Sequence, residues 1–86
     1  MIIRSQDKKE LHNFDRISNV CVLPCYRDEH KFIIEVNSQK TIGTYSTEEK
    51  AIKVLDMIED AYVNCNCNYV HNDVFQMPQD DEVEDE

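Results

Sequence analysis

The sequence Asn64-Cys65-Asn66-Cys67-Asn68 follows the one clear helical pattern in this chain of 86 residues, and the predicted fold is organised around it. Side chains two residues apart in an extended segment point to the same side, so Cys65 and Cys67 would share a face. The other two cysteines are Cys21 and Cys25, whose even spacing also places them on one face of a strand. Two close pairs, about forty residues apart in sequence, favour a tetrahedral four-cysteine zinc site.

A structural Zn²⁺ held by these cysteines would fasten the loop after the helix to the third strand and couple metal binding to folding. Two disulfides or four ordinary buried thiols are the alternatives. No signal peptide precedes the charged residues that follow Met1-Ile2-Ile3, so we expect the cytoplasm of a cell, where disulfides rarely persist. His71 or His30 could replace one cysteine as a ligand.

The hydrophobic pattern predicts an α+β fold: an antiparallel β-meander of four to five strands with one helix packed on it. Short apolar or alternating stretches predict strands at residues 2–4, 10–14, 20–25, 31–36 and 40–45, and residues 74–77 could add an edge strand. Gly43 is the only glycine, and its place inside a strand indicates a bulge or a close approach by another element. We expect one zinc-stapled domain over residues 1–78.

The helix is predicted from about Ser46 to Val63. Ser46 and Glu49 match a capping box, in which each side chain accepts a hydrogen bond from the backbone N–H of the other residue. An apolar stripe with helical spacing would pack against the sheet; it consists of Ala51, Leu55, Ile58 and Tyr62. Glu59 and Asp60 would oppose the helix dipole near the predicted C-terminal end, at a small cost in stability.

Charge is distributed very unevenly along the chain. Residues 1–53 hold all nine Lys and Arg against eight acids, whereas residues 54–86 hold ten acids and no Lys or Arg. The net charge of −9 disfavours binding of free nucleic acid, because such binding depends on neutralising phosphates. It favours a basic protein surface as the partner. Residues 79–86, with six acids, are expected to form a flexible tail.

No catalytic pattern is present in the sequence. It contains no GxSxG, HExxH or P-loop motif, and a single glycine makes a phosphate-cradling loop improbable. A closed four-cysteine site would also leave no open coordination position for a reacting water. No apolar run approaches the length that crosses a membrane. We therefore expect a binding protein rather than an enzyme, without a membrane partner.

Three stretches resemble short proteins carried by phages and mobile elements of Gram-positive bacteria. They are Met1–Lys8, Gly43–Ala51 and Val74–Pro78. Within that group the chain is similar to type II-A anti-CRISPR proteins, which inhibit Cas9. The resemblance implies stoichiometric binding by a monomer in the bacterial host, with the acidic protein covering a basic surface and blocking loading of target DNA.

The residues expected to contact Cas9 are acids of the predicted helix and tail. They are Asp56, Glu59, Asp60, Asp80, Asp81, Glu82, Glu84, Asp85 and Glu86. One alternative is an anti-defence protein that sequesters a nucleotide immune signal, with a positive pocket built from Arg4, Arg16 and Arg27. The other is a small DNA-binding regulator of the mobile element, which the net charge disfavours.

The zinc site gives the first testable prediction. Native mass spectrometry of the reduced protein is expected to show one Zn²⁺ per chain, and a chelator should remove it and destabilise the fold, since metal binding would be coupled to folding. A metal-free protein that is fully folded under reducing conditions would contradict the prediction.

Overall fold

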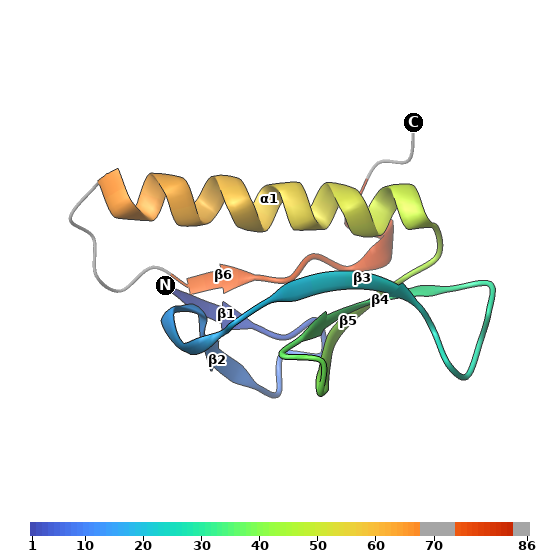
Figure 1. Cartoon of the computed structure of the whole chain (residues 1–86). Coiled ribbons are helices and arrows are strands. Elements are labelled where there is room, and N and C mark those ends of the chain that lie inside the picture. Colours follow the sequence, from blue (N-terminus) through green and yellow to red (C-terminus); the bar gives the residue numbers. More distant parts are fainter. Residues whose placement is uncertain (68–73, 84–86) are drawn as a thin grey trace.

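The computed structural model describes the backbone of residues 1–67 and 74–83 and the side chains of residues 1–63 and 74–83. Six strands, one long helix and two short 3-10 helices make up this part of the chain (Figure 1). In chain order they are β1 (Ile2–Arg4), β2 (Leu11–Asn13), η1 (Phe14–Arg16), β3 (Val20–Pro24), β4 (Phe32–Val36), β5 (Lys40–Tyr45), α1 (Glu48–Cys67), β6 (Val74–Gln76) and η2 (Asp80–Glu82).

The strands form two three-stranded sheets, ordered β2-β1-β6 and β3-β4-β5. The second is an antiparallel meander, as the sequence predicts for residues 20–45. Residues 37–39 connect β4 to β5, and a longer loop, residues 25–31, connects β3 to β4. The first is mixed, because β6 pairs in parallel with β1 although some seventy residues separate them. The predicted α+β class is confirmed, whereas the prediction of one meander with four to five strands is wrong. Pairing between strands at the two ends of a chain leaves no local pattern in the sequence.

Gln6 joins the two sheets. Its backbone N–H donates to the Ile42 carbonyl at 2.8 Å. Its side chain pairs with Thr44 in the manner of a strand residue, since Oε1 accepts from the Thr44 N–H at 2.8 Å and Nε2 donates to the Thr44 carbonyl at 3.0 Å. The end of β1 is thereby fixed to β5, and the two sheets together support α1, which lies across them (Figure 1).

One hydrophobic core lies between α1 and the sheets. Its buried members come from β1, β4, β5, α1 and the residues after β6: Ile3, Ile34, Val36, Ile42, Tyr45, Ala51, Val54, Ile58, Met77 and Val83. The predicted helical stripe is confirmed in Ala51 and Ile58, which are fully buried, and in Leu55 and Tyr62, which are half-buried at its edge.

Helix α1 begins at a different cap from the one predicted. Thr47 is the N-terminal cap, and its Oγ1 accepts from the Lys50 N–H at 3.1 Å. Ser46 does not cap, because its N–H and its hydroxyl both donate to Asp80 Oδ1, at 2.8 and 3.1 Å. The helix also continues to Cys67, beyond the predicted end near Val63, because each added residue gains a backbone hydrogen bond.

The first residues of the predicted acidic tail belong to the folded domain. Gln79 precedes η2, Asp80 binds Ser46, and Val83 is buried in the core with 6% of its surface exposed. The predicted boundary at residue 78 therefore does not separate a domain from a tail over residues 79–83. An acidic composition indicates disorder only where no residue is bound to the fold, and here Val83 and Asp80 both are.

Gly43 satisfies both alternatives that its position suggests. The β4–β5 register shifts between Ile34, which pairs with Gly43, and Glu35, which pairs with Thr41, so β5 carries an extra residue. A Cβ atom on Gly43 would also lie 3.0 Å from Met77 Cε and 3.0 Å from Tyr45 Cε2. A Cβ atom at residue 43 would therefore fit only if the Tyr45 ring and the Met77 side chain shifted by a few tenths of an ångström.

Replacing this glycine tests the packing. Gly43→Ala should lower the free energy of unfolding by about 1–3 kcal/mol, because the new methyl group would push the Tyr45 ring and the Met77 side chain out of their packed positions. Urea denaturation measures the change. Thr41→Ser, at an exposed position of the same strand, is the control and should change stability by less than about 0.5 kcal/mol. An alanine variant as stable as the parent would contradict this account of the close approach.

Candidate partner-binding groove

A cavity of about 470 Å³ opens between α1 and the segment that runs from η1 into β3. We call it the α1–β3 groove. It is lined by Phe14, Ile17, Ser18, Asn19, Val20, Leu55, Asp56, Ile58, Glu59 and Tyr62. Six of these residues are apolar, two are uncharged polar and two are acidic, and no Lys or Arg lines it. Mostly apolar concavities with a few fixed polar groups are typical of binding sites.

The apolar floor of the groove follows from local structure on both sides. Asn13 Oδ1 accepts from the Asp15 N–H at 3.0 Å, which caps the short helix η1 and directs Phe14 toward α1. The rings of Phe14 and Tyr62 meet with centroids 4.9 Å apart and planes inclined by 50°. Such a tilted pair adds to the stability that its buried area provides, so it fixes the groove at one end.

The acidic side of the groove is provided by Asp56 and Glu59. Both side chains are exposed, and neither makes a hydrogen bond or an ion pair within the described part of the chain. Within residues 1–63 and 74–83, no side chain therefore neutralises their charges. An incoming cation could pair with them without first displacing a lysine or arginine of this chain.

Two exposed apolar side chains flank these acids on the helix surface. Ile52 is four residues before Asp56 and 45% exposed, and Val63 is four residues after Glu59 and 53% exposed. Residues three or four apart are neighbours on a helix, so Ile52, Asp56, Glu59 and Val63 form one continuous row. An apolar groove bordered by acidic side chains matches the arrangement of an apolar interface centre with a polar rim.

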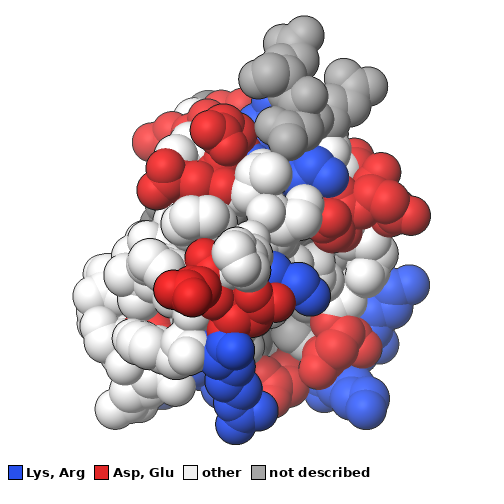
Figure 2. All heavy atoms as spheres, turned by 90° about the vertical axis from the view of Figure 1, so that its right-hand side faces the viewer, with Lys and Arg blue, Asp and Glu red and all other residues white. Residues whose placement is uncertain are grey.

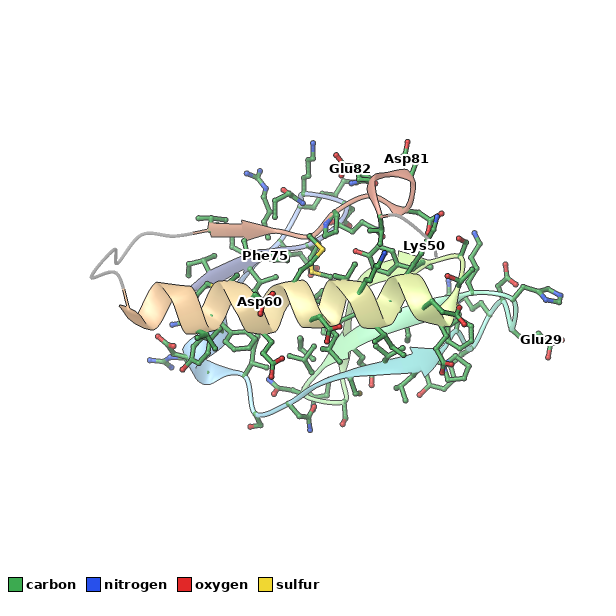
Figure 3. All side chains as sticks on the ribbon, turned by 90° about the horizontal axis from the view of Figure 1, so that it is seen from above. Glu29, Lys50, Asp60, Phe75, Asp81 and Glu82 are labelled. Atoms are coloured by element: carbon green, nitrogen blue, oxygen red, sulfur yellow. The ribbon has the colours of Figure 1, made fainter. Side chains whose placement is uncertain are left out.

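The other predicted contact residues do not share this site. Asp60 lies on the side of α1 that faces away from the sheets, and Asp81 and Glu82 lie on η2, on the opposite side of α1 from β3 (Figure 3). Glu84, Asp85 and Glu86 lie outside the described residues. At the end of the molecule where α1 begins, acidic and basic side chains are interspersed (Figure 2). The predicted acids therefore do not form a single continuous surface.

Asp80 binds residues of this chain, although it was predicted to contact the partner. It accepts from the N–H and hydroxyl of Ser46, as described above, and its Oδ2 lies 3.5 Å from Lys50 Nζ. Lys50 Nζ also donates to the Asp80 backbone carbonyl at 3.1 Å. The bond from the Ser46 N–H is the main reason why the pKa of the Asp80 carboxyl lies below its ordinary value. These contacts fasten η2 to the start of α1.

The structure describes half of the predicted zinc site. Cys21 and Cys25 are half-buried free thiols, and the side chains of Cys65 and Cys67 lie outside the described residues. The backbone of residues 65 and 67 is helical, so the alternation of an extended segment does not apply to them. Among the described side chains, no group of three or more His, Cys, Asp or Glu residues could hold a metal ion.

Cys21 and Cys25 themselves stand four strand residues apart. An extended strand separates such residues by roughly 13 Å, whereas Zn–S bonds of about 2.3 Å bring two sulfurs much closer together. Val20 and Val22 pack against the core, so the alternating Cys21 lies on the opposite face of the sheet. A single ion bound by both thiols would require β3 to bend near Pro24. The zinc site remains a prediction, to be decided by mass spectrometry.

Three arginines were expected to form a pocket in the nucleotide-binding alternative. Arg4, Arg16 and Arg27 are all exposed, and none of them lines the α1–β3 groove. Arg16 precedes β3 and Arg27 follows it, so the strand separates the two side chains. This placement does not favour a common anion site.

Sequence reasoning identified the acidic wall of the groove but missed the opposite wall. Phe14, Ile17 and Val20 recur at every third position, a spacing that marks one side of a turning chain. The signal was hidden because residues 14–20 combine a 3-10 turn, an irregular segment and the start of a strand.

Comparison of the chain with protein-family models, with curated proteins and with solved structures finds no match. No helix in the described ranges 1–67 and 74–83 combines the length and the apolar character needed to cross a membrane.

The role of Asp80 predicts a pH-dependent stability. Because its folded pKa is lowered, its contribution is present above the ordinary carboxyl pKa and is lost as the pH falls through the folded value, below about pH 4. Asp80→Ala should therefore cost about 1–2 kcal/mol at pH 7 and less at pH 3, as measured by urea denaturation. Asp81→Ala, at the exposed neighbouring position, is the control. Equal losses at both pH values would show that the charge of Asp80 does not act as described.

Proposed function

We propose that this protein is a stoichiometric protein-binding inhibitor that acts in the cytoplasm of a bacterial host. Its target is a type II-A Cas9, as the resemblance of residues 1–8, 43–51 and 74–78 to phage and mobile-element proteins suggests. In this proposal the chain is an anti-CRISPR protein that covers a basic nucleic-acid-handling surface and blocks loading of target DNA. It carries out no chemical step.

The observation that carries the proposal is the α1–β3 groove. It combines an apolar floor with two exposed acids that have no ion-pair partner within the described residues. Apolar contacts give such a surface affinity, and the acids give it a preference for a basic partner. The net charge of −9 favours the protein partner over free DNA or RNA, because phosphates would be repelled.

Cas9 offers the complementary surface. It holds the guide–target heteroduplex in a positively charged channel and reads the adjacent PAM with arginines. A rigid acidic protein placed there would compete with phosphates for the same cations. Long-range attraction between the opposite charges would also speed the encounter, and this effect is weakened by salt.

The order of addition tests the competition. Cas9 with its guide, incubated with this protein before target DNA is added, should lose most of its cleavage activity. Addition of the protein after the DNA should inhibit much less, because the basic surface is then already occupied. Cleavage of labelled target DNA measures both arms. Equal inhibition in the two orders would contradict competition for DNA loading, and no inhibition in either order would contradict the proposed target.

Charge reversal tests the groove. Asp56→Lys combined with Glu59→Lys should weaken binding to guide-loaded Cas9 on the order of tenfold or more, and should reduce its salt dependence. The matched control is Glu29→Lys combined with Asp81→Lys, which changes the net charge equally at two exposed sites away from the groove (Figure 3). Biolayer interferometry measures both. Equal weakening would assign the attraction to net charge and not to the groove.

A further inference from the structure

Within residues 1–67 and 74–83, strand β3 pairs with another strand along one side of its backbone only. The sheet order β3-β4-β5 places β3 at the edge. The Cys25 N–H donates to the Lys31 carbonyl at 2.9 Å and the Asn37 N–H donates to the Asn19 carbonyl at 3.0 Å, so the odd-numbered residues pair with β4. Because pairing alternates along an antiparallel strand, the N–H and C=O groups of Val20 and Val22 point away from β4.

This free edge and the α1–β3 groove are continuous. Val20 belongs to both, since its side chain lines the groove and its backbone lies on the free edge. Ser18 and Asn19, just before it, also line the groove. Seen from above, α1 runs alongside β3 (Figure 3). An extended chain placed along the edge would therefore lie between the strand and the acids of the helix.

We propose that the β3 edge and the α1–β3 groove form one site, which binds an extended segment of a partner protein as an added strand. The inference rests on the proposed protein-binding function. It adds how the partner binds and which kinds of residue the bound segment carries. Backbone hydrogen bonds to Val20 and Val22 would provide register. Side chains alternate along a strand, so apolar residues of the segment would enter the groove while a lysine or arginine reaches Asp56 and Glu59.

Charge selects a basic partner segment over a second copy of this chain. Two copies joined along β3 would bring the same two acids, Asp56 and Glu59, toward each other in a protein of net charge −9. The edge is also short, because Pro24 has no N–H to donate. Short edges that contain proline disfavour self-association, whereas a segment that also fills the groove gains contacts beyond the backbone.

A peptide probe tests the site without Cas9. The probe is a short capped peptide of alternating valine and lysine, added to the ¹⁵N-labelled full chain. Amide hydrogen exchange of Val20 and Val22 should slow by roughly tenfold or more, while Cys21 and Leu23, already paired with β4, should change little. The matched control is the same peptide with N-methyl groups on alternate residues, which keeps charge and side chains but cannot pair with an edge.

Asp56→Lys combined with Glu59→Lys should abolish the protection, and Glu29→Lys combined with Asp81→Lys should retain it. The proposal is overturned if the probe does not bind, if the N-methylated peptide binds equally well, or if protection appears elsewhere. It is also overturned if Val20 and Val22 are already protected without peptide in a protein that sediments as a dimer. Cas9 cleavage is a separate measurement, so a protein that takes the peptide at β3 but spares Cas9 would reject the proposed target alone.

Discussion

The junction between the two sheets is the constraint on which the rest of the structure depends. Next to the pairing of Gln6 with Thr44, the Tyr45 hydroxyl donates to the Pro78 carbonyl at 2.8 Å inside the core. Burial raises the pKa of that hydroxyl well above its ordinary range, so it stays protonated and remains a donor at every physiological pH. The bond joins β5 to the chain that leaves β6, and the missing side chain at Gly43 makes the approach possible. A buried donor left without this carbonyl would be costly.

The junction sets the position of α1 and hence of the groove. Once Pro78 is held against Tyr45, the next residues reach Ser46 and Lys50, and Asp80 fastens them to the start of the helix. At its other side α1 packs on β3 and β4, and its residues Val54 and Ile58 belong to the shared core. Residues from early and late parts of the sequence thus hold the helix in place. Packing, and not charge, therefore decides that Asp56 and Glu59 lie beside β3.

The sequence could predict the local elements but not their long-range partners. Alternating or apolar runs located the strands, and the spacing of Ala51 and Ile58 located the buried side of the helix, because both patterns are periodic and local. The parallel pairing of β6 with β1 has no such signature. The choice of helix cap is similar. By residue type Ser46 is a better cap than Thr47, but Asp80, more than thirty residues away, binds Ser46, and Thr47 caps the helix instead.

The same limit separates the acids. In sequence, Asp80 and Asp56 are equivalent members of a negative region. In the structure, Asp80 binds Ser46 and Lys50, whereas Asp56 borders the groove. Which acid is available to a partner depends on what its neighbours in space donate, and that information is absent from composition. Of the four cysteine side chains, those of Cys21 on β3 and of Cys25, directly after it, lie within the described residues.

The helix length also changes the argument for a functional acidic face. If α1 ended near Val63, Glu59 and Asp60 would lie in its last turn, where the dipole penalises negative charge and a compensating function would be needed to explain them. The helix instead reaches Cys67, and the dipole effect fades within the last turn, so these acids cost little. Their position along the helix is therefore no evidence of function. What distinguishes Glu59 from Asp60 is that Glu59 and Asp56 border an apolar groove beside an unpaired strand edge, where an acid can select the residues of an incoming chain.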